Sequence, residues 1–125
     1  KGRVIEHSTL KAYENRGNEL KGVATPSMGS ERLEVWSSSI APGGSTPLHS
    51  HSSQEIFIIL QGEGYVEIGE QRLPFRAPAT IIAPANQPHR LFNTGSTPTK
   101  QIVVIEGCST ILSPEGKQLE LPWRK

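Results

Sequence analysis

The stretch TPLHSHSSQEIFIIL, residues 46–60, places two histidines two positions apart and a glutamate four positions after the second. Side chains of a β-strand alternate between its two faces, so residues two or four apart point the same way. His49, His51 and Glu55 therefore share one face, and Phe57 and Ile59 continue that face with apolar side chains. If this face lines the interior, two imidazoles and one carboxylate converge among hydrophobic groups.

The composition around this stretch predicts a small all-β domain. The chain has 125 residues, of which 12 are glycine and 10 are proline. Between these turn formers lie short runs rich in Val, Ile, Leu and Thr, and no segment of any length has a helical apolar period. We expect one domain over residues 1–125, with an N-terminal strand and loop region over 1–28, a barrel core over 29–112 and a C-terminal tail or helical turn over 113–125.

Short apolar runs bounded by Gly and Pro predict the strands, whereas residues 11–31 are polar and predict irregular loops. The expected strands are RVIEHSTL (3–10), LEVWSSSI (33–40), QEIFIIL (54–60), a hairpin over 62–75 that turns near Gly69-Glu70, TIIAPA (80–85), HRLFN (89–93), QIVVIEG (101–107) and a last strand and turn over 109–121. Seven to nine short strands favour a jelly-roll barrel, because this fold protects its strand edges and leaves a hollow interior.

The charge pattern excludes several classes of partner. The net charge is +1 with no block of like charge, which argues against a nucleic-acid partner. No apolar run approaches 18 residues, so we expect no membrane span. The sequence predicts a soluble protein whose last residues, ELPWRK, are not an ER-retention signal, and it leaves open whether the chain is secreted or cytoplasmic.

The converging polar groups need a partner if they are buried. An unpaired carboxylate in an apolar interior costs several kcal/mol, and a divalent metal removes this cost by taking imidazole nitrogens and a carboxylate oxygen directly. His89, in the separate segment PANQPHRLFN, can supply a fourth ligand from a facing strand. His7 has no companion ligand and is predicted to be a surface or packing residue.

The full spacing is far more specific than a lone His-x-His. Gly43, five residues, His49-x-His51, three residues, Glu55, six residues and Gly62 resemble the first motif of the cupin superfamily without a departure. The second cupin motif is matched in part: Pro84, His89 and Asn93 stand at its offsets, whereas Pro78 and Asn86 occupy the places of two glycines. The resemblance implies a cupin barrel with a metal in its interior.

Within the cupins, residues 29–108 resemble the plant auxin-binding protein group. The segments that carry this resemblance are LEVWSSSIAPGGSTPLHSHSSQEIFIILQGEG, APANQPHRLFNTG and QIVVIEG. The resemblance implies a zinc ion held by His49, His51, Glu55 and His89, and a small carboxylate ligand on that ion. By motif position, the implied wall of the ligand pocket is Trp36, Thr46, Pro47, Phe57 and Trp123. The group's ER-retention tail, paired cysteines and glycosylation site are absent from this chain.

Two functions remain open at this stage. The first is metal-dependent binding of an auxin-like aromatic acid, with its carboxylate on the metal and its body against aromatic walls. The second is a small cupin metalloenzyme, a dioxygenase, decarboxylase, isomerase or lyase, at the same three-His-one-Glu site. A closed structural metal site is a weaker third reading. Zinc follows from the resemblance, while the ligand types also suit Mn, Fe, Ni and Co. We also expect a homodimer that pairs through residues 3–10.

Overall fold

Short strands arranged in two facing layers build the protein. The computed structural model describes residues 2–124. Its strands are β1 (Tyr13–Asn15), β2 (Asn18–Ala24), β3 (Leu33–Ser39), β4 (Ser50–His51), β5 (Glu55–Gln61), β6 (Glu63–Ile68), β7 (Gln71–Arg76), β8 (Ala79–Ala83), β9 (His89–Asn93), β10 (Lys100–Glu106), β11 (Ile111–Leu112) and β12 (Gln118–Leu119). Three short 3-10 turns are described: η1 (His7–Thr9), η2 (Pro26–Met28) and η3 (Pro122–Arg124).

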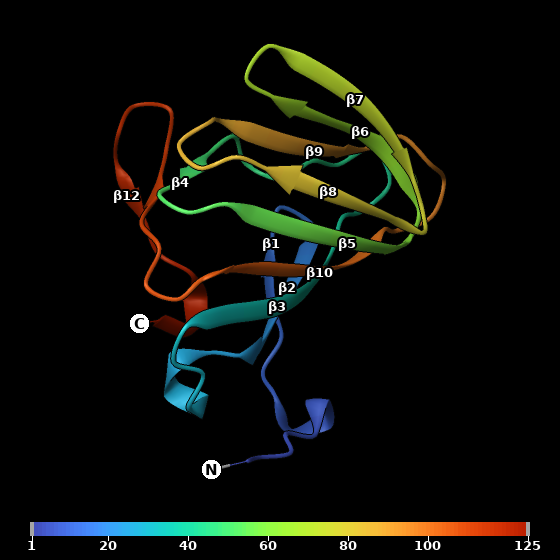
Figure 1. The fold of residues 1–125 in the computed structure, drawn as a ribbon. Coiled ribbons are helices and arrows are strands. Elements are labelled where there is room, and N and C mark those ends of the chain that lie inside the picture. The colour runs from blue at the N-terminus through green and yellow to red at the C-terminus, as the bar shows by residue number, and fades with distance from the viewer. Residues whose placement is uncertain (1, 125) are drawn as a thin grey trace.

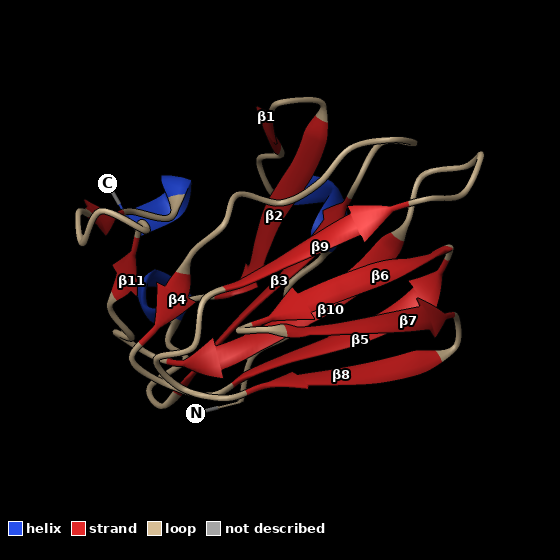
Figure 2. Cartoon of the chain, turned by 90° about the horizontal axis from the view of Figure 1, so that it is seen from above, coloured by secondary structure: helices blue, strands red, loops and turns tan. Residues whose placement is uncertain are grey.

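One layer is a six-stranded sheet in the order β1-β2-β3-β10-β5-β8. The facing layer consists of the three-stranded sheets β7-β6-β9 and β12-β11-β4, which backbone pairing between His49 and His89 links. Figures 1 and 2 show β6, β7 and β9 lying over β5, β8 and β10, with the C-terminal strands at one end. This all-β jelly-roll arrangement, closed by a helical turn near the C-terminus, confirms the predicted fold class.

The core lies between the two layers because inward and outward side chains alternate along each strand. β9 and β10 bury every second residue, and β5 buries Glu55, Phe57 and Ile59. The opposite face of β5 leaves Ile58 and Leu60 exposed on the outer surface. The interior of the barrel is therefore the face that carries the predicted metal ligands.

Backbone conformation explains which residue types occur at two positions of the sequence motifs. Gly62 has φ +102°, and a Cβ there would lie 2.9 Å from Thr99 Cγ2, so a side chain would be both strained and crowded. Asn86 has φ +64°, a left-handed conformation that asparagine tolerates better than most residues. Asparagine can therefore stand where the superfamily motif has glycine.

The N-terminal part of the prediction is wrong. Residues 3–10 do not form a strand: the 3-10 turn η1 lies there, and Val4 is 89% exposed. The segment 11–31, expected to be irregular, instead contains the hairpin β1–β2, whose partners include Tyr13 with Leu20. Strand pairing through residues 3–10 therefore loses its basis, and the homodimer stays a prediction. No helix among residues 2–124 is long and apolar enough to cross a membrane.

Candidate metal centre

The four predicted ligands come from strands of three different sheets and from one loop. His51 ends β4, Glu55 begins β5, His89 begins β9, and His49 lies just before β4. The segments of His49 and His89 are joined by backbone hydrogen bonds in both directions, at 2.8 and 3.3 Å. This pairing brings a residue from the second motif beside those of the first, as the sequence predicted.

The ligand atoms converge on one point. Glu55 Oε1 lies 2.5 Å from His89 Nε2, 3.0 Å from His51 Nε2 and 4.0 Å from His49 Nε2. One ligand atom from each of the four side chains lies within 4.8 Å of all the others. Three of these residues are buried and His49 is half-buried, so one side of the cluster is more open than the rest.

Backbone carbonyls orient two of the three imidazoles. His49 Nδ1 lies 2.7 Å from the carbonyl oxygen of Pro47, and His89 Nδ1 lies 3.2 Å from that of Gln87. A carbonyl oxygen can only accept a hydrogen bond, so Nδ1 carries the proton, and in the neutral imidazole Nε2 keeps its lone pair. Both Nε2 atoms are thus oriented towards the cluster, the arrangement found where histidine binds a metal.

Several polar atoms at this centre lack a hydrogen-bond partner within the protein. They are Nδ1 and Nε2 of His51, Nε2 of His89 and Oε1 of Glu55, all buried. Buried polar atoms are nearly always paired, and each orphan requires an explanation. Imidazole nitrogens and a carboxylate oxygen are suitable donors for a divalent cation, so the residues present fit a bound metal.

The electrostatics of the cluster favour the protonation states that metal binding requires. Burial, together with the nearby His89 and His51, lowers the pKa of His49 to about 4, although Glu55 opposes the shift. For Glu55, burial alone would raise the pKa, but the close approach of His51 and His89 outweighs burial and lowers the pKa to about 2. At neutral pH, His49 is therefore neutral and Glu55 is ionised.

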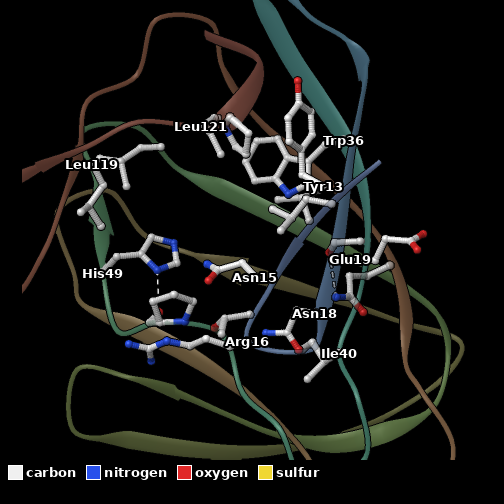
Figure 3. A pocket seen from close by; sticks show the side chains of 18 of the residues that line it. Tyr13, Asn15, Arg16, Asn18, Glu19, Trp36, Ile40, His49, Leu119 and Leu121 are labelled. Carbon is white, nitrogen blue, oxygen red and sulfur yellow. Dashed lines mark hydrogen bonds between the residues drawn. The ribbon is translucent and has the colours of Figure 1, made fainter. Parts of the chain in front are cut away.

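A cavity of about 820 Å³ opens beside this cluster. His49, His51 and Glu55 line it, as do four of the predicted wall residues: Trp36, Thr46, Pro47 and Phe57. Further apolar lining comes from Leu20, Ile40, Val103, Ile111, Leu119 and Leu121. Figure 3 shows His49 in this cavity with Trp36, Leu119 and Leu121 around the same space.

Trp123, the fifth predicted wall residue, is not among the residues that line the cavity. Its ring packs against Trp36, with ring centroids 5.6 Å apart, and its Nε1 donates to Glu34 at 2.9 Å. Glu34 is fully buried and also accepts hydrogen bonds from the guanidinium of Arg124. Trp123 thus supports Trp36 from behind instead of facing the cavity.

Sequence reasoning missed the hairpin beside the cavity and a buried carboxylate outside it. The hairpin β1–β2 contributes Tyr13, Asn15, Arg16 and Asn18 to the cavity lining, and Figure 3 labels all four around it. Glu34 was also missed, although it shares the strand parity of Trp36, so alternation along β3 could have placed it inside.

A jelly-roll barrel whose interior holds three histidines and one glutamate beside an apolar cavity defines a class of small β-barrel proteins. The Cupin domain model matches residues 36–105. Since this match covers more than half of the chain, the chain belongs to the cupin family.

The chain is similar to individual proteins both in sequence and in structure. Auxin-binding protein 4 of Zea mays is 34% identical over 86 residues, which is 62% of this chain and 42% of that protein; the match spans less than half the length of that relative. The Lactobacillus farciminis oxalate decarboxylase formate complex superposes with TM-score 0.78 at 21% identity, over 86% of this chain and 34% of that chain. A predicted oxalate decarboxylase from Thermotoga maritima superposes with TM-score 0.67 at 26% identity, over 83% of this chain and 98% of that chain.

Proposed function

We propose that this cupin binds one divalent metal through His49, His51, Glu55 and His89 and uses it to hold the carboxylate of a small acid with an apolar body. The observation that carries the proposal is the set of buried, unpartnered donor atoms at the wall of the cavity. Neither feature alone points to a ligand; together they support a cation site that an acid can reach from the cavity.

The charge of the loaded site supports an anionic ligand. Three neutral imidazoles, one carboxylate and a divalent cation leave a net charge of +1. The side of the cluster at His49 is the more accessible one, and His49 lines the cavity. A carboxylate entering from the cavity would neutralise the remaining charge and complete the coordination of the metal.

The remaining wall supports an apolar ligand body. Trp36 and Phe57 line the cavity beside Leu20 and Val103, and the volume of about 820 Å³ lies in the range of sites that hold drug-sized ligands. An aromatic acid fills such a space better than a bare dicarboxylate. The similarity to auxin-binding protein 4 is in keeping with an aromatic acid of the auxin type. Zinc is proposed as the metal from the resemblance of the motifs alone.

The experiment combines metal analysis with calorimetry. Protein purified without a histidine tag should contain one divalent metal per chain, with zinc preferred over Mn, Fe, Ni and Co. Indole-acetate and phenylacetate should then release heat with metal-loaded protein and none with stripped protein. Acid binding that is equal with and without metal would contradict the proposal.

A matched pair of histidine variants tests the ligand set. His51→Ala should lose the metal, because it removes one of four ligands from a buried cluster. His7→Ala provides the control, since His7 is exposed on η1 and its loss should leave the metal content unchanged. Stoichiometric metal in His51→Ala would exclude the proposed ligand set.

A second candidate function is decarboxylation or a related reaction of a small dicarboxylate at the same centre. It is favoured by the similarity to the predicted oxalate decarboxylase of Thermotoga maritima, which extends over 98% of that chain. Incubation of the metal-loaded protein with oxalate under air would reveal turnover as released formate or carbon dioxide. Turnover of oxalate, with no heat from aromatic acids, would replace the first proposal by this one.

A further inference from the structure

The apolar wall of the cavity is interrupted by one polar pair on its inner face. Gln101 on β10 and Ser38 on β3 are Cα partners in the sheet register, and both line the cavity. Gln101 is only 2% exposed, and its Nε2 donates to Ser38 Oγ at 2.8 Å. This pair is a second polar feature of the cavity, separate from the metal cluster.

The contact with Ser38 provides a hydrogen-bond partner for only one end of the Gln101 amide. Gln101 Oε1 is buried and has no hydrogen-bond partner. Turning the amide over would let the Ser38 hydroxyl donate to Oε1, but the NH₂ group would then lack an acceptor. Either orientation leaves one end of a buried amide unpaired at the cavity wall, and such a group favours any ligand that can pair with it.

The sheet register measures how far this pair lies from the metal cluster. Gln101 pairs with Ile59 on β5, four residues beyond Glu55 on the same face, which corresponds to about 13 Å along the strand. A metal–oxygen bond and a hydrogen bond take up part of that span and leave about 8 Å for the ligand. A para-substituted phenyl ring with a short acid arm has this reach.

The space between the two polar ends is apolar. Val103 lies between Gln101 and the level of Glu55 on the inner face of β10, and its sheet partners are Trp36 on one side and Phe57 on the other. All three side chains are buried and line the cavity. The cavity thus presents a cation site, an aromatic and aliphatic band and an unpaired amide in that order.

We propose that Gln101 and Ser38 form a polar subsite for a hydroxyl group at the far end of the ligand, which makes the ligand class hydroxyaryl carboxylic acids. The inference rests on the proposed metal-held carboxylate and adds a second recognition point to it. A hydroxyl can both donate and accept, so it pairs with the free end of the amide in either orientation. Gln101 acts by contact with the ligand, and Ser38 positions the amide.

The test compares three acids on the metal-loaded protein by titration calorimetry. Phenylacetate reports the metal-held carboxylate, 4-methylphenylacetate adds bulk alone, and 4-hydroxyphenylacetate adds a hydroxyl of similar size. One recovered hydrogen bond to a buried amide should make the hydroxy acid bind about 10-fold tighter than the methyl acid. In Gln101→Leu, which keeps the size of the side chain, this preference should disappear while binding of the methyl acid is retained.

A matched control and a second variant accompany this comparison. Gln61→Leu makes the same change on the exposed end of β5 and should keep the 10-fold preference. Ser38→Ala is the milder variant if Gln101→Leu folds poorly, and it should reduce the preference because it frees the amide from its anchor. Metal content and thermal melts confirm that each variant is folded and loaded.

The outcomes separate this inference from the proposed function. Equal affinity of the wild type for the hydroxy and methyl acids, with phenylacetate binding retained, would overturn the subsite alone. A hydroxyl preference that survives in Gln101→Leu would also overturn it, because another group must then pair with the hydroxyl. Failure of phenylacetate itself to bind the metal-loaded protein would overturn the proposed function.

Discussion

Glu34 and Glu55 are two buried carboxylates at one level of the same sheet, and their surroundings differ completely. Both are Cα partners of Ile105, on opposite sides of β10, so their backbones are about 10 Å apart. Both are at most 1% exposed. Position, burial and residue type are therefore matched, and only the partners of the two carboxylates distinguish them.

Protein donors satisfy Glu34. Trp123 Nε1 donates at 2.9 Å and Arg124 Nε at 3.2 Å, while Arg124 also donates to the carbonyl oxygen of Ser109. Hydrogen bonds to Glu34 raise the pKa of the Arg124 guanidinium, so Arg124 stays charged. Glu55 instead faces three imidazoles and lines the cavity. A carboxylate paired with a permanent cation stabilises the fold. One surrounded by imidazole nitrogens remains available to bind a metal.

The largest expected effect is the loss of metal affinity when the Glu55 carboxylate is removed. Glu55→Gln removes the only anionic ligand of the proposed centre, and metal affinity should fall by more than about 100-fold. At neutral pH the metal-free variant should also unfold at a lower urea concentration than the metal-free wild type, because the lowered pKa of Glu55 means that the folded state favours the ionised carboxylate, which glutamine lacks. Metal analysis after dialysis and urea titration measure both effects, and retained stoichiometric metal would refute the assignment.

Glu34→Gln should lower stability without affecting the metal. The change leaves Arg124 beside a neutral partner in a mostly buried site, which costs about 3 kcal/mol of unfolding free energy. The loss should be equal in the metal-loaded and metal-free protein, and the metal content should stay at one per chain. Urea denaturation of both forms checks this result. Loss of the metal from Glu34→Gln would show that the two carboxylates are not independent.

A smaller effect is expected at Trp123, which joins the Glu34 cluster to the cavity wall. Trp123→Ala should lower the unfolding free energy by about 2 kcal/mol, since the side chain is half-buried and its ring packs against Trp36. The affinity for an aromatic acid should drop more than that for acetate, because Trp36 loses its support. Trp123→Phe keeps a ring and is the control. An equal loss for both acids would show that Trp123 does not influence the cavity.

The smallest expected effect tests the packing of Trp123 against β2, the strand beside Trp36. A Cβ at Gly22 would lie 2.9 Å from Trp123 Cδ2 and 2.8 Å from Thr25 Cγ2, so Gly22→Ala should force Trp123 to shift. Such overpacking costs about 1 kcal/mol. A thermal melt measures the cost, and Gly2→Ala is the control because nothing lies within 4 Å of a Cβ at that position. An unchanged melt for Gly22→Ala would mean that Trp123 moves freely.

Much of the metal cluster could be predicted because it depends on local spacing within two motifs. Strand alternation pairs His49 with His51 but does not extend to Glu55, because residues 52–54 separate β4 from β5; the motif spacing indicated Glu55 and His89. Each of these residues lies in or beside a strand whose inner face is defined by its own neighbours. The backbone pairing of His49 with His89 is a long-range contact, but it joins two residues that the motifs had already indicated.

The rest of the site depends on features that a sequence pattern does not show. Arg16 and Gly17 form the two-residue turn of the β1–β2 hairpin, with φ values of +56° and +81°, and arginine is an unusual residue at such a position. The polar segment therefore looked like a loop. Residues 3–10 contain β-prone side chains, yet no neighbouring strand pairs with them. Trp123 was assigned by resemblance to the cavity, but its partner Glu34 is far away in the sequence.

The position of β10 between β3 and β5 has a consequence for the newly made chain. Translation produces all four metal ligands and most of the cavity wall before residue 100, yet β3 and β5 become neighbours only when β10 inserts between them. At about 5–20 residues per second, the nascent chain spends time with two unpaired hydrogen-bonding edges facing each other across a gap. Such edges invite pairing with another chain, so the emerging polypeptide is exposed to aggregation during this interval.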